Sequence, residues 1–234
     1  MLPTTFITQH RREFLRWLVA APALAGCAVK TEEDASGEGD GVAPPEVATS
    51  EEAATACKPT LRDPEGPYFE AGAPRRSVLL ASANEPGVKL VMQGFLLGGA
   101  CKKALAGYVL DVWQADAEGN YYGREEDGFR LRGKIVTDAQ GRYRFDTVLP
   151  GHYGDDAGIR PAHIHVKVRT PLGNELLTTQ LYFAGDPYLG QRDYCTRNRA
   201  CDSADPNRHL RLTDVLVQNK PAKLSRFDYV LART

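Results

Sequence analysis

The chain lacks several features that would assign it to a common class of protein. The apolar run near its amino terminus, Trp17 to Ala25, is shorter than the ~20 residues that a membrane-spanning helix requires. The chain contains no cluster of basic residues with interleaved aromatic side chains, which argues against nucleic-acid binding. No repeat with a period of ~20–50 residues is visible, which argues against a solenoid or propeller. No Cys-x-x-Cys spacing occurs, which argues against a zinc site built on cysteines.

The overall charge is nearly balanced, but it is unevenly distributed. The 234 residues carry a net charge of -1, whereas residues 30–56 hold eight acidic side chains against one lysine. Residues 57–234 hold 25 basic and 21 acidic residues, a net charge of +4. This mild excess suits an anionic small molecule and is too weak to indicate a nucleic-acid partner. The hydrophobic content of 42% is typical of a globular protein.

Residues 1–26 are predicted to be an export signal. An Arg-Arg-x-Phe-Leu pattern begins at Arg11 and resembles the twin-arginine signal of bacteria. The sequence Leu-Ala-Gly-Cys ending at Cys27 resembles a lipobox, so we expect cleavage before Cys27, lipidation of its thiol and attachment to the periplasmic face of a bacterial membrane or outer membrane. A signal cut at small residues, giving a periplasmic or secreted protein, stays open as an alternative. The acidic segment 27–56 is predicted to be a solvated tether.

Four cysteines remain after Cys27, and their even number suits two disulfides in an oxidising compartment. Cys195 and Cys201 are close in sequence and lie among polar residues, so we expect them to pair. That pairing leaves Cys57 for Cys101, although sequence does not fix the connectivity.

Residues 57–234 are predicted to form one all-β domain. Short β-type runs, separated by Gly, Pro and Asp, occur at residues 88–95, 106–115, 133–137, 143–148, 162–169, 176–183 and 227–231. This spacing, without long helical periodicity, predicts a β-sandwich. Residues 57–87 and 184–222 show less pattern and are predicted to be long loops that wrap the sandwich.

A His-x-His pair lies in one of these predicted strands. Because side chains alternate along a strand, His163 and His165 would point to the same face, ~6.6–6.8 Å apart along it. Both imidazoles could then reach one metal ion. Two ordinary strand histidines are the competing interpretation, and they are the more frequent case for this pattern alone.

An ordered series of sequence blocks surrounds this pair. The blocks are Glu65 to Phe69, Leu110 to Asp116, Gly119 to Tyr121, Thr137 to Phe145, Pro150 to Tyr153, Arg160 to His165 and Thr179 to Pro187. Together they resemble the intradiol ring-cleavage dioxygenases, the family of catechol 1,2-dioxygenase and protocatechuate 3,4-dioxygenase, over residues 64–187. The pattern follows most closely that of the protocatechuate 3,4-dioxygenase β-subunit.

The resemblance implies a mononuclear non-haem Fe(III) site. Its ligands would fall on Tyr121, Tyr153, His163 and His165, with Tyr122 as an alternative to Tyr121. Phenolates are hard anionic donors and stabilise Fe(III) over Fe(II), which agrees with this ligand set.

The resemblance also implies roles for two further residues. Arg160 would stabilise negative charge on the substrate, and Gln180 would orient Arg160 and the substrate. The substrate would be a catechol, cleaved with O2 between its two hydroxylated carbons to a cis,cis-muconate-type dicarboxylate. Tyr153 would serve both as ligand and as base.

The sequence departs from the family pattern at two places. Nine residues separate Tyr153 from His163, and the acidic stretch Gly154-Asp155-Asp156 follows Tyr153, which puts a carboxylated substrate such as protocatechuate in doubt. The helical dimer segment of catechol 1,2-dioxygenases is not found, so dimerisation in that mode is not expected, and another homo-oligomer stays open.

Three alternatives remain at this point. The domain could be a non-catalytic β-sandwich binding module that has lost its metal. It could instead be a copper or zinc hydrolase that uses His163 and His165 with Asp138 or Asp186. Residues 1–56 alone would also suit a structural outer-membrane lipoprotein.

Overall fold

The computed structural model describes residues 57–76, 80–123, 128–155 and 158–232. The predicted signal peptide and tether, residues 1–56, lie outside the described residues. Within the described part of the chain, no helix has the length and apolar character needed to cross a membrane.

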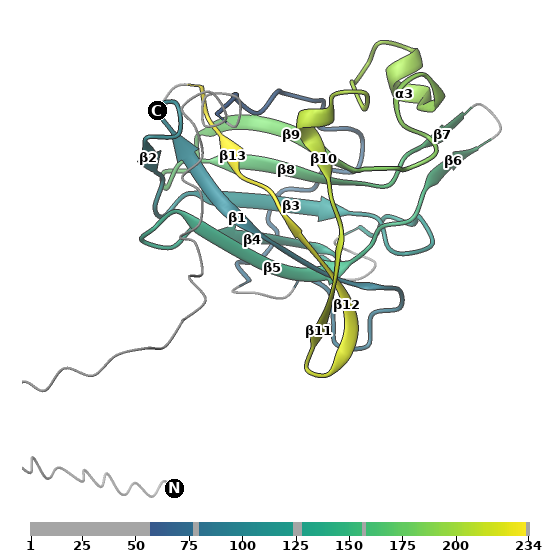
Figure 1. Cartoon of the computed structure of the whole chain (residues 1–234), viewed down its shortest axis with the longest axis horizontal. Coiled ribbons are helices and arrows are strands. Elements are labelled where there is room, and N and C mark those ends of the chain that lie inside the picture. Colours follow the sequence, from purple (N-terminus) through teal and green to yellow (C-terminus); the bar gives the residue numbers. More distant parts are fainter. Residues whose placement is uncertain (1–56, 77–79, 124–127, 156–157, 233–234) are drawn as a thin grey trace, which may run out of the picture. The chain divides into compact units, whose positions relative to one another are not determined.

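The described residues form an all-β fold with two main sheets and a separate hairpin (Figure 1). The six-stranded sheet has the order β11-β12-β1-β13, with β2 and β5 also pairing with β1. Its strands are β1 (Lys89–Gly98), β2 (Lys103–Ala104), β5 (Arg142–Val148), β11 (Thr213–Val217), β12 (Lys220–Arg226) and β13 (Tyr229–Val230). The five-stranded sheet has the order β10-β9-β8-β3-β4 and contains β3 (Val109–Gln114), β4 (Arg132–Val136), β8 (His163–Arg169), β9 (Glu175–Phe183) and β10 (His209–Leu210). The hairpin is β6 (Tyr153–Asp155) with β7 (Gly158–Arg160).

The two main sheets pack face to face around one apolar core. One cluster of buried side chains contains Leu90, Met92 and Phe145 of the six-stranded sheet. It also contains Ile164 and Val166 of β8 in the five-stranded sheet. Such interdigitation of two inner faces is what defines a β-sandwich, so the predicted fold class is confirmed.

Strand β8 is buried on both of its faces. Ile164 and Val166 point into the core, so His163, His165 and Lys167 point to the opposite face, and all five side chains are buried. The loop of residues 57–76 covers that opposite face with residues 64–69, because Gln180 Nε2 of the neighbouring strand β9 donates to Pro64 O over 2.8 Å and Lys167 Nζ lies 3.9 Å from the ring centroid of Phe69. The predicted wrapping loop at the start of the domain is therefore present.

A buried ion-pair cluster holds the second wrapping segment in place. This segment contains three short helical turns, η1 (Gly190–Arg192), α3 (Tyr194–Arg197) and η2 (Pro206–Arg208). The side chain of Arg208 is 1% exposed and lies 2.6 Å from Asp63 Oδ2 and 3.1 Å from Asp205 Oδ2. Asp63 and Arg208 are far apart in the sequence, so this contact joins the two wrapping segments beneath β9.

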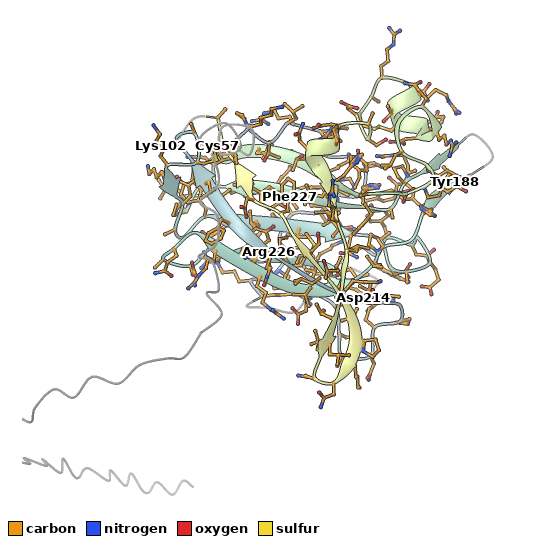
Figure 2. All side chains as sticks on the ribbon, in the orientation of Figure 1. Cys57, Lys102, Tyr188, Asp214, Arg226 and Phe227 are labelled. Atoms are coloured by element: carbon orange, nitrogen blue, oxygen red, sulfur yellow. A yellow bond between two sulfur atoms is a disulfide. The ribbon has the colours of Figure 1, made fainter. Side chains whose placement is uncertain are left out.

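Both predicted disulfides are present. Cys57 and Cys101 have Cα atoms 5.8 Å apart and tie the start of the described domain to the turn after β1 (Figure 2). Cys195 and Cys201, with Cα atoms 5.4 Å apart, close a loop that contains most of α3.

All seven predicted strands are found, but the loop prediction for residues 184–222 is wrong in its second half. Strands β10 and β11 and the start of β12 occupy residues 209–222. The tip of the β11–β12 hairpin is Gln218-Asn219, and both residues have positive φ values, 50° and 60°. A two-residue turn of this kind usually carries glycine, so its absence here removed the usual hairpin signal.

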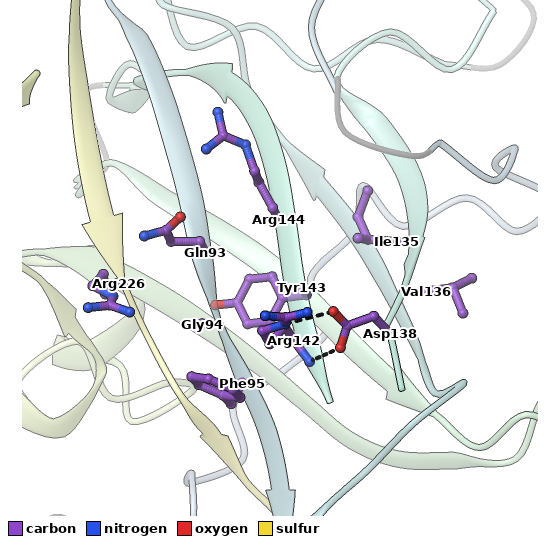
Figure 3. Close-up of a pocket in the computed structure, with 10 residues that line it drawn as sticks. All are labelled: Gln93, Gly94, Phe95, Ile135, Val136, Asp138, Arg142, Tyr143, Arg144 and Arg226. Carbon is purple, nitrogen blue, oxygen red and sulfur yellow. Dashed lines mark hydrogen bonds and ion pairs between the residues drawn. The ribbon is translucent and has the colours of Figure 1, made fainter. Parts of the chain in front are cut away.

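The outer face of the six-stranded sheet carries polar side chains. It has a depression of about 350 Å³ whose lining includes Gln93, Arg142, Arg144 and Arg226 (Figure 3). Arg142 Nε donates to Asp138 Oδ2 over 2.8 Å, and both side chains are largely exposed. This surface pair contrasts with the buried pairs of Arg208.

Replacing Arg208 with Met should destabilise the domain strongly, because it leaves the carboxylates of Asp63 and Asp205 buried without their cation. We expect a loss of about 3–5 kcal/mol in the free energy of unfolding. Arg142→Met, which removes the exposed pair, is the matched control and should leave the urea midpoint unchanged within error. Equal effects of the two variants in urea denaturation would contradict this assignment.

Candidate active site

Two imidazoles meet on the covered face of β8. His163 and His165 are 2% and 1% exposed, and their Nε2 atoms lie 3.0 Å apart. Strand β8 pairs with β3 on one side and β9 on the other, which places His165 opposite Trp113 and Gln180. The indole ring of Trp113 stacks on His165 with a centroid distance of 4.7 Å. The two predicted histidines are thus brought together by their strand.

The hydrogen bond of His163 Nδ1 makes Nε2 the ring nitrogen that carries the lone pair. His163 Nδ1 lies 2.6 Å from Pro161 O, so Nδ1 carries the proton and donates it to that carbonyl. His165 Nδ1 is buried and has no hydrogen-bond partner among the described residues. Burial and, second, the neighbouring Arg160 lower the pKa of His163 to about 3, and burial together with His163 and Arg160 lowers the pKa of His165 well below its ordinary value. Both imidazoles are therefore neutral at physiological pH, the form that binds metal ions.

Tyr121 and Tyr153 border the two imidazoles. The hydroxyl of Tyr121 lies 3.5 Å from His163 Nε2, and the rings of Tyr121 and Tyr153 meet edge to face at 5.3 Å. The ring of Tyr153 lies 5.5 Å from that of His163. The turn before Tyr121 is built by Asp116, whose Oδ1 accepts the backbone N–H groups of Glu118 and Asn120. The same turn packs against Gly151, where a Cβ would lie 2.4 Å from Ala117 O.

The protein alone keeps both phenols protonated. Burial raises the pKa of Tyr121 well above its ordinary value, and the neighbouring Tyr153 raises it further. Burial also raises the pKa of Tyr153, against the opposing effect of Arg160. Ionisation of these phenols at neutral pH therefore requires a strong cation between them and the imidazoles.

The structure distinguishes Tyr121 from its neighbour Tyr122. The hydroxyl of Tyr122 donates to Asp116 Oδ2 over 2.5 Å, and the guanidinium of Arg130 lies 4.0 Å from the ring centroid of Tyr122. Tyr121 is the one whose hydroxyl approaches His163. The geometry therefore favours Tyr121 over Tyr122 as a ligand.

The two imidazoles and two phenols offer a mixed set of nitrogen and oxygen donors that could hold one metal ion. Two nitrogen donors bound to one ion at ~2.1 Å and at a right angle lie ~3.0 Å apart, which agrees with the observed Nε2–Nε2 distance of 3.0 Å. Two phenol oxygens complete a set of mixed N and O donors, the composition that suits Fe(III). Of the two ring nitrogens of His165, Nδ1 has no hydrogen-bond partner among the described residues, whereas Nε2 contacts His163.

The two aspartates of the hydrolase alternative do not join this set. Within the ranges that the structure describes, no group of three His, Cys, Asp or Glu side chains is placed to hold a metal ion. Asp138 accepts from Arg142 on the outer sheet face. Asp186 Oδ2 accepts the backbone N–H of Ala162 over 3.0 Å and lies 2.8 Å from His152 Nε2. The geometry therefore argues against a site built from His163, His165 and either aspartate.

Arg160 and Gln180 lie beside the tyrosines, as predicted. The buried guanidinium of Arg160 donates from Nη2 to Gln180 Oε1 over 2.8 Å and from Nη1 to Tyr153 Oη over 3.4 Å. Gln180 Nε2 in turn donates to Pro64 O over 2.8 Å. The amide and the wrapping loop thus orient the cation toward Tyr153.

Sequence reasoning missed two residues at the site. Tyr68, 38% exposed, stacks on Tyr121 with ring centroids 4.1 Å apart and planes 7° apart. It lies in the Glu65 to Phe69 block, which was quoted for the resemblance but given no role. Asp193, fully buried, lies 2.8 Å from Arg160 Nε in a segment that was read as plain loop. No local pattern signals that contact.

Comparisons with known proteins point to one family. Catechol 1,2-dioxygenase 2 of Acinetobacter lwoffii is 39% identical over 148 residues, which are 56% of this chain and 53% of that protein. The protocatechuate 3,4-dioxygenase beta chain of Burkholderia cepacia is 36% identical over 150 residues, 56% of this chain and 63% of that one. The chain spans about half the length of the catechol and chlorocatechol dioxygenases that it matches first.

Solved structures give the same result. The dioxygenase domain of a dioxygenase carbohydrate-binding protein fusion from Streptomyces sp. SirexAA-E superposes with a TM-score of 0.59 at 37% identity, covering 76% of this chain and all of that one. A sequence model of the dioxygenase family matches residues 64–231, which is most of the chain. The chain therefore belongs to the dioxygenase family of the catechol 1,2- and protocatechuate 3,4-dioxygenases, the intradiol dioxygenases.

Proposed function

We propose that this protein is a non-haem Fe(III) intradiol dioxygenase. It would cleave a catechol with O2 between the two hydroxylated carbons and give a cis,cis-muconate-type dicarboxylate. The observation that carries the proposal is the meeting of two neutral imidazoles and two phenols beside a buried guanidinium. The relatives named as catechol 1,2-dioxygenases support it.

Tyr121, Tyr153, His163 and His165 would hold the iron. When bound, Fe(III) would supply the Lewis acidity that makes a catechol ring reactive toward O2. The chain itself supplies neutral nitrogen donors, since burial depresses the pKa of both histidines. It also supplies phenols that give up their protons only to a strong cation.

Tyr153 is suited to move a proton. Because burial raises its pKa, the phenolate oxygen of Tyr153 binds a proton firmly and can take one from a catechol hydroxyl. Arg160 Nη1 lies 3.4 Å from that oxygen and keeps a positive charge beside it. The same fixed guanidinium would stabilise negative charge that develops on the substrate ring.

Aromatic side chains define the surroundings of the reacting groups. The Tyr68 ring stacks on Tyr121, and Trp113 stacks on His165 and meets Phe69 edge to face. Trp113 is buried on the inner side of the site, and the exposed Tyr68 lies at its border. Flat apolar walls of this kind suit a planar aromatic substrate.

We propose a catechol without a ring carboxylate as the preferred substrate. The acidic stretch after Tyr153 supports this choice, because it would repel a carboxylate. The side chains of Asp155 and Asp156 lie outside the described residues, and the support comes from the sequence of this stretch.

We further propose export and membrane anchoring through a lipidated Cys27, supported by the signal-like residues 1–27.

Purified protein loaded with ferric iron should be coloured and should consume O2 when catechol is added. Removing the iron with a chelator should abolish both the colour and the O2 uptake, and adding iron back should restore them. An oxygen electrode with catechol, protocatechuate, hydroxyquinol and chlorinated catechols measures the substrate range. Protein that binds no iron would refute the proposal. Iron binding without O2 uptake on any of these substrates would favour a non-catalytic binding module.

Tyr153→Phe should change the visible absorption of the iron protein and lower kcat/KM by about 100-fold, because it removes both a donor oxygen and the proton acceptor. The matched control is Tyr122→Phe, whose hydroxyl contacts Asp116. It should keep the wild-type spectrum and kcat/KM within about twofold. If Tyr122→Phe altered the spectrum and Tyr153→Phe did not, the ligand assignment would be wrong.

A further inference from the structure

Asp193 contacts Arg160, but it lies outside the sequence motifs that predicted the site. Its Oδ1 accepts from Arg160 Nε over 2.8 Å, and its side chain is fully buried. It lies in the wrapping segment between η1 and α3, outside every block that carries the family resemblance. The role of Asp193 is therefore indicated by its contacts in the folded protein.

Two partners together fix the orientation of the Arg160 guanidinium. Asp193 holds Nε, and Gln180 holds Nη2 over 2.8 Å. Because the guanidinium is planar and rigid, contacts on two of its nitrogens determine where the third nitrogen lies. That third nitrogen, Nη1, is the one that approaches Tyr153 Oη at 3.4 Å. The approach to Tyr153 thus depends on the two holding contacts.

The carboxylate of Asp193 is itself held in one rotamer. Its Oδ1 also accepts the backbone N–H of Cys195, and its Oδ2 accepts the hydroxyl of Thr196, each over 3.0 Å. The disulfide from Cys195 to Cys201 closes the loop directly after it. Asp193 is therefore a rigid support for the cation.

Charge strengthens the argument. Arg160 is buried, and a buried cation needs an anion or several hydrogen-bond acceptors to be stable. Gln180 and Tyr153 are neutral in the iron-free site, which leaves Asp193 as the anionic partner that the structure gives Arg160. Without the charge of Asp193, the guanidinium would be held through Nη2 alone, by Gln180 and the hydroxyl of Tyr182, and could turn about that end.

We propose that Asp193 is a positioning residue that holds the Arg160 guanidinium at its working distance from Tyr153. The effect on turnover rests on the proposed function. Asp193 acts through Arg160 and does not itself reach the reacting atoms.

The first test is a double-mutant cycle in the iron-loaded protein. Asp193→Asn keeps the size of the side chain and should lower kcat by about 10-fold, with KM changed by less than about threefold, because the arginine acts after substrate has bound. In an Arg160→Gln background the same substitution should lower kcat by less than about twofold, since the residue through which it acts is gone. Equal losses in both backgrounds would overturn the proposal.

Asp205→Asn is the matched control. Asp205 is also a buried aspartate that caps a short helical turn, accepting from Asn207 N, and it also pairs with an arginine Nε, that of Arg208. It makes no contact with Arg160. This variant should lower the melting temperature as much as Asp193→Asn does, yet leave kcat and KM within about twofold of wild type.

The second test does not depend on activity. In iron-free protein, the ¹⁵N NMR signal of Arg160 Nε–H, assigned by its loss in Arg160→Gln, should show slow hydrogen exchange. Asp193→Asn should speed that exchange by at least about 10-fold, and Asp205→Asn should leave it unchanged. Unchanged protection in Asp193→Asn would overturn the proposal. If wild-type protein consumed no O2, the proposed function would fail, while this comparison would still decide whether Asp193 orients Arg160.

Discussion

The register of β8 between β3 and β9 is the constraint on which the site depends. Ile164, Val166 and Val168 are fully buried in the core, so they fix which face of the strand points inward. A shift of one residue would turn these side chains outward and carry His163 and His165 into the core. The core packing therefore sets the position of both imidazoles, and the backbone that carries them is held in place by the packed sheets.

The second face of β8 would be open to water without the two wrapping segments. Residues 57–76 and 184–208 close it, and they are held by buried ion pairs of Asp63, Asp193, Arg160 and Arg208. Buried ion pairs of this kind contribute little net stability, but breaking one leaves an unpaired charge. Their role here is to orient the two arginines: Arg160 lies next to Gln180, and Arg208 lies next to the ring of Tyr182.

Much of the architecture could be predicted because periodicity and turn residues are local signals. The seven strand predictions follow from such signals, and the ordered blocks singled out the residues that the structure brings together. Three features escaped. The β11–β12 turn uses Gln218-Asn219 in place of glycine, Tyr68 stacks on Tyr121 from 53 positions away, and Asp193 meets Arg160 from 33 positions away. The contacts of Tyr68 and Asp193 are tertiary and lie in no short window of sequence, whereas the turn at Gln218-Asn219 is local but lacks the glycine that would signal it.

The arrangement around β1 has a consequence for how the chain folds. Strand β1 pairs in parallel with β12 and β13, so Leu90 lies opposite Lys223, 133 positions later. Contacts of such separation form slowly, because a long loop must close before they stabilise anything. During synthesis, one edge of β1 stays open until almost the last residue of the domain has left the ribosome. The chain must therefore protect that strand edge from neighbouring chains until β12 and β13 have been made.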